Sequence, residues 1–248
     1  HVRSRRQRQM CIRDRLIHDA KAARVKVVVK LVSSDGIGTI AVGVAKAGAD
    51  VINIAGGSGG TGAAAVTSLK YNGRSAEIGL AEVNQALCIN KIRQKVILRC
   101  SGAHQTGTDV VKSAILGADS FEFGTSVMMM LKCVMAKNCN IKCPAGLTTN
   151  SELFDGDPRA LAQYFLNIAH EVREILANNG FKSIKDIRGR SDLLHLINHK
   201  SSVGQLNFKL MLKQVDNLEI FNPIYLEKNY DHDQNLYHWF LEKFNYSK

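Results

Sequence analysis

Three of the six cysteines lie close together, at Cys133, Cys139 and Cys143. Thiolate is a soft ligand that holds iron–sulfur clusters and zinc, so cysteines at this density indicate a metal site. A C-x5-C-x3-C spacing that ends in Cys-Pro is more typical of iron–sulfur loops than of the paired C-x2-C motifs of structural zinc sites. Three ligands suit a cluster that lacks one iron corner. A zinc site completed by a histidine, or three buried apolar side chains, remain alternatives.

Lys30 is the second residue that attracts attention, because it interrupts a β-branched run at residues 25–32. A lone charge there costs several kcal/mol unless an anion pairs with it. At the carboxyl end of a strand, a lysine can stabilise negative charge on a reduced flavin ring. The alternative is a buried ion pair with Glu82 or Asp35. His104 is a candidate base, although a loop histidine without a visible partner is more often not catalytic.

The elements that position these residues repeat along the chain as strand, glycine-rich loop and helix. The near copies Ala-Lys-Ala-Gly-Ala-Asp and Ala-Ile-Leu-Gly-Ala-Asp, at 45–50 and 114–119, mark an internal repeat. Repeated parallel strands covered by helices indicate a Rossmann-type open sheet or a (β/α)8 barrel, of which four units are half. We predict strands at 25–32, 50–54, 96–100 and 120–123, and helices at 39–46, 76–90 and 109–116, then a Met-rich helical stretch.

The loops after these strands are candidate ligand sites. Residues 57–62 satisfy G-x-G-x-x-G, but the acidic residue of a dinucleotide site is missing at the end of the next strand. This loop either lets backbone amides approach an anion or a flat ring, or is a tight turn without a ligand. If the four units are the second half of a barrel, Ser101-Gly102 and Gly124-Thr125 occupy the loops where barrels commonly bind phosphate.

The remaining sequence predicts a helical extension and a poorly patterned end. A long amphipathic helix at 158–179 should stop at Gly180 in a left-handed conformation, followed by a short helix at 181–187. The predicted domains are a non-native leader (1–15), the second half of a (β/α)8 TIM-type barrel with the cysteine-rich loop (16–150), the helical extension (151–194) and a poorly patterned C-terminal segment (195–248).

Composition sets the broad class of the protein. The chain has 248 residues, of which 45% are apolar and 22% charged, so it is neither disordered nor fibrous. Its net charge of +11 suggests nucleic-acid binding, but a charge of +5 belongs to residues 1–15. No apolar run is long enough to span a bilayer, and no signal peptide follows the basic start. We therefore expect a soluble cytoplasmic protein without a nucleic-acid or membrane partner.

Taken in order, motifs between residues 25 and 194 resemble the large subunit of glutamate synthase, specifically the second half of its FMN-binding barrel. The motifs are VKLV at 29–32, GIGTI at 36–40, GGTGA at 59–63, IGLAE at 78–82, TGTDV at 106–110, the cysteine segment at 133–144, Gly-Asp-Pro at 156–158 and GRSDL at 189–193. An ordered series of this length is far more specific than any one loop.

The resemblance implies an oxidoreductase that makes L-glutamate by hydride transfer from reduced FMN to 2-iminoglutarate. That imine forms from 2-oxoglutarate and ammonia, which a glutaminase domain missing from this chain releases from glutamine. Electrons would come from ferredoxin or an NAD(P)H-oxidising subunit through a 3Fe-4S cluster. The implied residues are Cys133, Cys139 and Cys143 for the cluster, Lys30 for the flavin ring, Ser101, Gly102, Gly124 and Thr125 for its phosphate, and Gly59, Gly60 and Thr61 for substrate.

Two positions depart from the family pattern, since the second cysteine gap is three residues rather than four, and Gly57-Ser58 replaces a bulkier polar pair. A half barrel exposes strand edges, so we expect poor solubility and no activity from this chain alone. Another FMN-dependent barrel oxidoreductase is an alternative, but an oxidase of 2-hydroxy acids needs a base histidine where Gly57 stands. The other alternative is a non-catalytic module that binds metal or nucleic acid.

Overall fold

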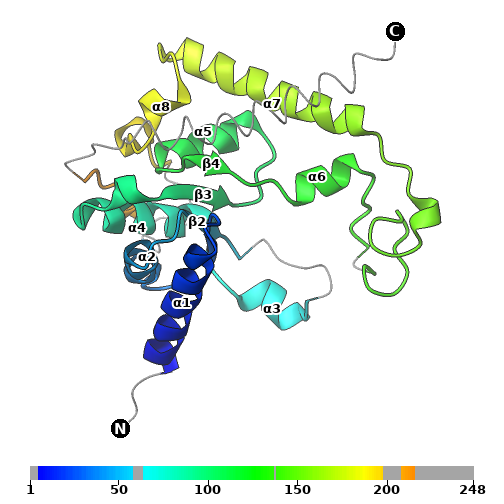
Figure 1. Ribbon diagram of the computed structural model, residues 1–248. Coiled ribbons are helices and arrows are strands. Elements are labelled where there is room, and N and C mark those ends of the chain that lie inside the picture. The colour runs from blue at the N-terminus through cyan, green and yellow to red at the C-terminus, as the bar shows by residue number, and fades with distance from the viewer. Residues whose placement is uncertain (1–4, 58–63, 137, 198–207, 216–248) are drawn as a thin grey trace. The chain divides into compact units, whose positions relative to one another are not determined.

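The computed structural model describes residues 5–57, 64–136, 138–197 and 208–215, all within one compact unit formed by residues 1–217 (Figure 1). Strands and helices alternate through the first half of the chain. The elements are α1 (Arg5–Ala22), β1 (Val28–Val32), α2 (Ile37–Lys46), β2 (Val51–Ala55), α3 (Val66–Tyr71), α4 (Ala76–Ile89), β3 (Ile97–Ser101), α5 (Gly107–Ile115), β4 (Ser120–Phe121), α6 (Thr125–Met130), α7 (Pro158–Asn178) and α8 (Ile184–Ile187). Short 3-10 helices lie at Arg93–Lys95, Ser151–Leu153, Ser191–Leu193 and Phe208–Leu210.

The four strands form one parallel sheet in the order β1-β2-β3-β4. Lys30 on β1 lies opposite Asn53 on β2, which lies opposite Arg99 on β3. A helix follows each strand, as parallel pairing requires. The predicted α/β class with a parallel sheet is therefore confirmed, while β1 and β4 are shorter than the runs predicted at 25–32 and 120–123.

One face of the sheet, here called the apolar face, packs against α2 and α4. Its side chains are between 0% and 6% exposed and belong to a single hydrophobic cluster: Leu31, Ile52, Ile54, Leu98 and Cys100. The two helices also contact each other closely. A Cβ on Gly38 would lie 2.9 Å from the Cβ of Ala86, so this close approach of α2 to α4 depends on glycine.

The opposite face, here called the polar face, carries Lys30, Asn53, Arg99 and Ser120, with Glu122 directly after β4. It is partly open, since Val28 and Val32 at the two ends of β1 are 50% and 40% exposed. Side chains alternate between the faces along each strand, so the same strands supply both surfaces.

Buried charges hold the amino ends of the strands. The Asp119 carboxylate accepts hydrogen bonds from the guanidinium groups of Arg93 and Arg188, and all three side chains are 5–6% exposed. Burial lowers the pKa of Arg188. Asp50 accepts from Lys21 at 2.7 Å; burial alone would raise the pKa of this carboxyl, but the bond from Lys21 and other hydrogen bonds and charges outweigh it. The Asp119 pairs are costly to break because each partner would remain buried.

The helical extension was well predicted. Asp157 caps the amino end of α7, Pro158 is its first residue, and Gly180 has a φ of +76° just beyond its end. The side chains of α5, α7 and α8 form a second hydrophobic cluster, which includes Leu176 and Ile187. The helix α1 was not predicted and runs through residue 15, and the domain boundaries remain predictions.

Among the described residues, no helix is both long enough and apolar enough to cross a bilayer. The cytoplasmic location remains a prediction.

Candidate functional site

Lys30 lies in the middle of β1 on the polar face, and its Nζ is 3.3 Å from Oε1 of Glu122. The two side chains are 56% and 37% exposed, so this is not the buried ion pair that the sequence left as the alternative. Neither predicted partner contacts it. Asp35 and Glu82 both pair with Arg74 instead. Glu82 belongs to α4, which packs on the apolar face, whereas Lys30 lies on the polar face.

Asn53 joins this pair from the neighbouring strand. Its Nδ2 donates a short hydrogen bond to Oε2 of Glu122, and the residue is 3% exposed. Its Oδ1 is buried and has no hydrogen-bond partner among the described residues. Sequence analysis missed both Asn53 and Glu122. The available signal was a polar residue in the otherwise apolar β2, and a charged residue between Phe121 and Phe123.

The two predicted phosphate loops lie side by side at the carboxyl ends of β3 and β4. Ser101 is the last residue of β3, while Gly124 and Thr125 begin α6. The loops are joined where Ser126 Oγ donates to the backbone carbonyl of His104 at 2.7 Å. A Cβ built on Gly124 would meet nothing within 4 Å, so the space beside that backbone is open.

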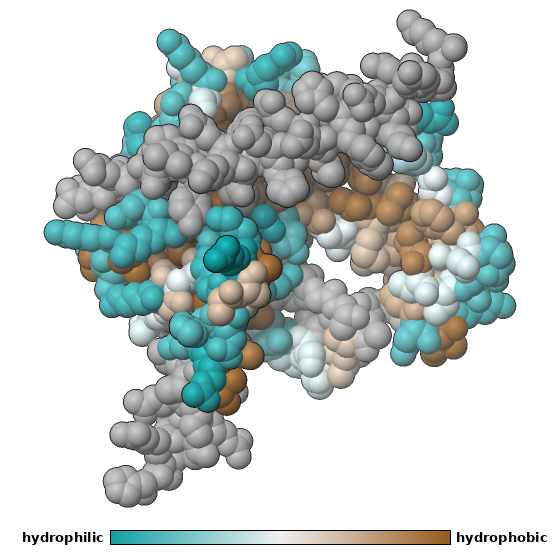
Figure 2. Space-filling model, in the orientation of Figure 1, coloured by the Kyte–Doolittle hydropathy of each residue, from teal (hydrophilic) through white to brown (hydrophobic). Residues whose placement is uncertain are grey.

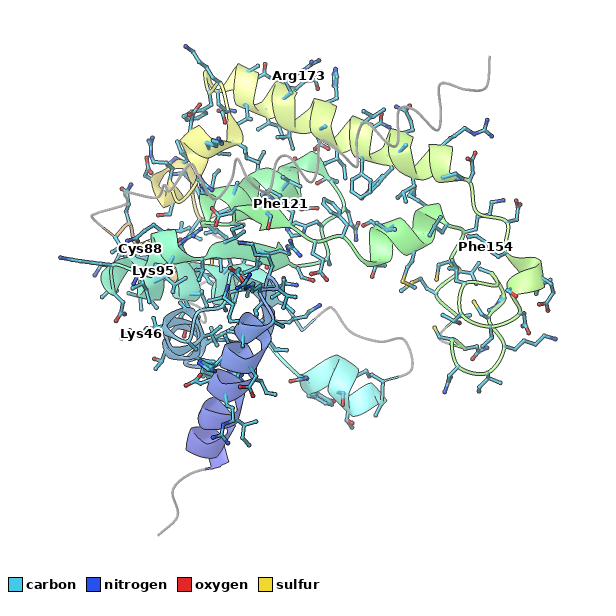
Figure 3. All side chains as sticks on the ribbon, in the orientation of Figure 1. Lys46, Cys88, Lys95, Phe121, Phe154 and Arg173 are labelled. Atoms are coloured by element: carbon cyan, nitrogen blue, oxygen red, sulfur yellow. The ribbon has the colours of Figure 1, made fainter. Side chains whose placement is uncertain are left out.

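His104 is 2% exposed and lies between these loops. Its Nε2 is hydrogen-bonded to Ser113 Oγ at 2.9 Å, and its Nδ1 lies 3.3 Å from the carbonyl oxygen of Glu122. The imidazole packs edge-on against Phe121, labelled on β4 in Figure 3, with 5.8 Å between ring centroids. The imidazole of His104 therefore has hydrogen-bond partners that could not be predicted from the sequence. Its burial favours a structural role over that of a catalytic base.

Glu171 of α7 fastens the loop after β3. Its carboxylate accepts from the backbone N–H groups of Gly107 at 2.7 Å and Thr108 at 3.2 Å, at the amino end of α5. The hydrogen bond from Gly107, with those from Thr108, lowers the pKa of this carboxyl. A Cβ on Gly107 would lie 2.9 Å from the Cβ of Glu171, so α5 and α7 touch here through glycine.

The cysteine segment follows α6 and has little regular structure. Cys133 and Cys139 are partly exposed free thiols, whereas Cys143 is 6% exposed. The hydrogen bond from the backbone of Thr148, with others from neighbouring N–H groups, lowers the pKa of the Cys143 thiol to about 7. This turn therefore favours a thiolate at Cys143. The surface at the right of Figure 2 mixes apolar and hydrophilic side chains. Within the cysteine segment, Ile141 is 78% exposed.

The predicted metal site is not assembled in the part of the chain that the structure describes, where no three His, Cys, Asp or Glu side chains converge. The assignment of Cys133, Cys139 and Cys143 as ligands remains a prediction. The predicted substrate residues Gly59, Gly60 and Thr61 lie outside the described residues.

Comparison with known proteins identifies relatives over most of the chain. A family model described as "Conserved region in glutamate synthase" matches residues 6–182. The glutamate synthase [NADPH] large chain of Bacillus subtilis (strain 168) is 44% identical over 231 residues, which are 89% of this chain and 15% of that protein. The ferredoxin-dependent glutamate synthase of Pyropia yezoensis is 50% identical over 176 residues, 69% of this chain and 11% of that protein. The chain thus spans a small part of these relatives.

Solved structures share the fold at low sequence identity. A mutant flavocytochrome b2 with benzoylformate matches with a TM-score of 0.51 and 13% identity, over 78% of this chain and 43% of that chain. A flavocytochrome b2 variant with sulfite bound gives a TM-score of 0.50 at 13% identity, over 78% of this chain and 44% of that chain. At this identity the match shows a common α/β fold with a parallel sheet.

Proposed function

Because this chain belongs to the glutamate synthase family, we propose that it is the flavin- and electron-accepting part of a longer glutamate synthase. The intact enzyme would form L-glutamate from 2-oxoglutarate and ammonia derived from glutamine. The observation that carries this proposal is the polar face, where Lys30 lies on a parallel sheet whose adjoining loops are tied together by Ser126 and His104. These loops lie at the carboxyl ends of β3 and β4. Open parallel sheets and barrels bind their ligands at the carboxyl ends of the strands.

We propose that the four βα units are the C-terminal half of a (β/α)8 TIM-type barrel, with the cysteine-rich loop and α7–α8 as additions. The parallel order β1-β2-β3-β4 supports this, because successive barrel strands are neighbours. The polar face would then point into the barrel, and the other half would be supplied by the longer polypeptide.

The residues present fit FMN. In this proposal Lys30 faces the ring, while the phosphate is held by Ser101, Gly102, Gly124 and Thr125. The open space beside the backbone of Gly124 supports its role in binding the phosphate. When bound, FMN would supply hydride transfer to 2-iminoglutarate. The Lys30 ammonium would stabilise the negative charge of a reduced ring. Gly59, Gly60 and Thr61 are proposed to contact substrate.

We further propose that Cys133, Cys139 and Cys143 hold a 3Fe-4S cluster that receives electrons from ferredoxin or an NAD(P)H-oxidising subunit. The donor set fits in kind, and the N–H groups around Cys143 suit a thiolate ligand. The described residues do not bring the three sulfurs to one point.

The test is anaerobic purification of the complete polypeptide, followed by iron, sulfide and flavin analysis of one sample. We expect about three irons and one FMN per chain, with the broad visible absorption of a cluster. Cys139→Ala should remove the cluster absorption and leave the FMN. Cys88→Ala, at a buried cysteine of α4 labelled in Figure 3, is the control and should change neither. Zinc without flavin would overturn the proposal.

A further inference from the structure

Asn53 has a feature that the proposed function does not use. The residue is 3% exposed, yet its Oδ1 is a buried acceptor without a hydrogen-bond partner among the described residues. Buried polar atoms are nearly always hydrogen-bonded, and an orphaned one costs free energy. An unpaired acceptor on a candidate ligand face is a position where a bound ligand can supply the missing donor.

The orientation of the Asn53 amide is set by its neighbour. An ionised carboxylate only accepts hydrogen bonds, so Glu122 must face the Nδ2 group of Asn53 rather than its oxygen. Turning the amide over would place its oxygen against the carboxylate, which is unfavourable. Glu122 therefore fixes Oδ1 as the free end of the amide.

Lys30 supplies the complementary group. Its ammonium contacts the other oxygen of the same carboxylate at 3.3 Å, and Lys30 and Asn53 are opposite each other on adjacent strands. Adjacent strands are about 4.8 Å apart. Glu122 thus holds a cationic donor and a neutral acceptor next to each other on the polar face. A ring edge with a carbonyl beside an N–H, as in a cyclic imide, has the matching pattern.

We propose that Asn53 Oδ1 accepts a hydrogen bond from the N3–H of the pyrimidine ring of the flavin, beside a ring carbonyl that faces Lys30. Glu122 is the positioning residue that orients both groups. This inference rests on the proposed binding of FMN and adds the residues that form hydrogen bonds with the edge of its pyrimidine ring. It requires no covalent step.

The test uses the full-length protein with its flavin removed, and measures dissociation constants for FMN and for FMN methylated at N3 by quenching of flavin fluorescence. The methylated ring cannot donate to Asn53. We expect it to bind the unchanged protein at least about tenfold more weakly than FMN, the loss typical of one buried hydrogen bond.

Two variants separate the hydrogen bond from the bulk of the methyl group. Asn53→Leu keeps a side chain of similar size but has no acceptor, so it should bind both flavins about equally. Glu122→Gln should reduce the preference to roughly threefold, because a glutamine can donate as well as accept and lets the Asn53 amide turn over. The melting temperature of each variant reports whether it folds, and the preference of the unchanged protein remains a test if one does not.

The outcomes distinguish this inference from the proposed function. Equal binding of both flavins by the unchanged protein would overturn the role of Asn53 and leave FMN binding intact. A preference that persists in Asn53→Leu would show that the methyl group clashes with another residue, and would also overturn it. Binding of neither flavin would overturn the proposed function and this inference together.

Discussion

The two faces of the sheet are built by the same strands and differ in their polar side chains and in how far β1 is exposed. On the apolar face, Leu98 and Ile52 are fully buried against α2 and α4. On the polar face, Lys30 and Asn53 each donate to the carboxylate of Glu122, and the ends of β1 are half exposed. Parallel sheets usually have both faces covered by apolar contacts. The difference indicates that the apolar face stabilises the fold, and it agrees with the proposal that the polar face binds a ligand.

The largest loss of stability is expected when packing is removed from the apolar face. Leu98→Ala should lower the free energy of unfolding by about 2–5 kcal/mol, because the side chain is fully buried and leaves a cavity. Leu166→Ala, the same change at a residue of α7 that is 59% exposed, is the control and should stay within about 0.5 kcal/mol. Urea unfolding followed by circular dichroism measures both. Equal losses would mean that the apolar face is not the core.

The α/β fold with its parallel sheet could be predicted from the sequence, because β-branched runs, glycine-rich loops and helices alternate along the chain. The charge of Lys30 in a strand predicted a special position, and the structure places it on the polar face. Its partner could not be predicted, since Glu122 is 92 residues away and meets Lys30 only when β1 and β4 lie in one sheet. Local patterns carry no information about such contacts.

The cysteine segment shows the opposite limit. The spacing of Cys133, Cys139 and Cys143 predicts a metal site from local sequence alone, yet the described residues do not bring the sulfurs together. His104 lies between these cases. Its sequence context suggested a loop residue without partners, whereas contacts with Ser113 and Glu122 bury it, and those depend on how the loops pack.

Two neighbouring valines on β1 allow the two faces to be tested by the same substitution. Val28 belongs to the polar face, and Val29 packs against the apolar cluster. Val29→Ala should lower the free energy of unfolding by about 1 kcal/mol, because it removes two partly buried methyl groups, and Val28→Ala by about half as much. Urea unfolding of this chain at low concentration compares them. In the longer polypeptide, where the proposed other half of the barrel would cover the polar face, the two costs should become similar. An unchanged difference there would contradict the half-barrel proposal.

The smallest effect concerns the loop at the edge of the polar face, where Glu171 accepts from Gly107 and Thr108. Its pKa is lowered in the folded protein, so its contribution is complete above the unfolded value near 4.5 and disappears as the pH falls through the lower folded value. Glu171→Gln should therefore cost about 0.3–1 kcal/mol at neutral pH and progressively less below about pH 4. Thermal unfolding across this pH range measures the difference. Leu166→Ala changes an exposed side chain of the same helix that does not ionise, so it should change the stability equally at every pH, and a parallel response in both variants would remove the specific role of Glu171.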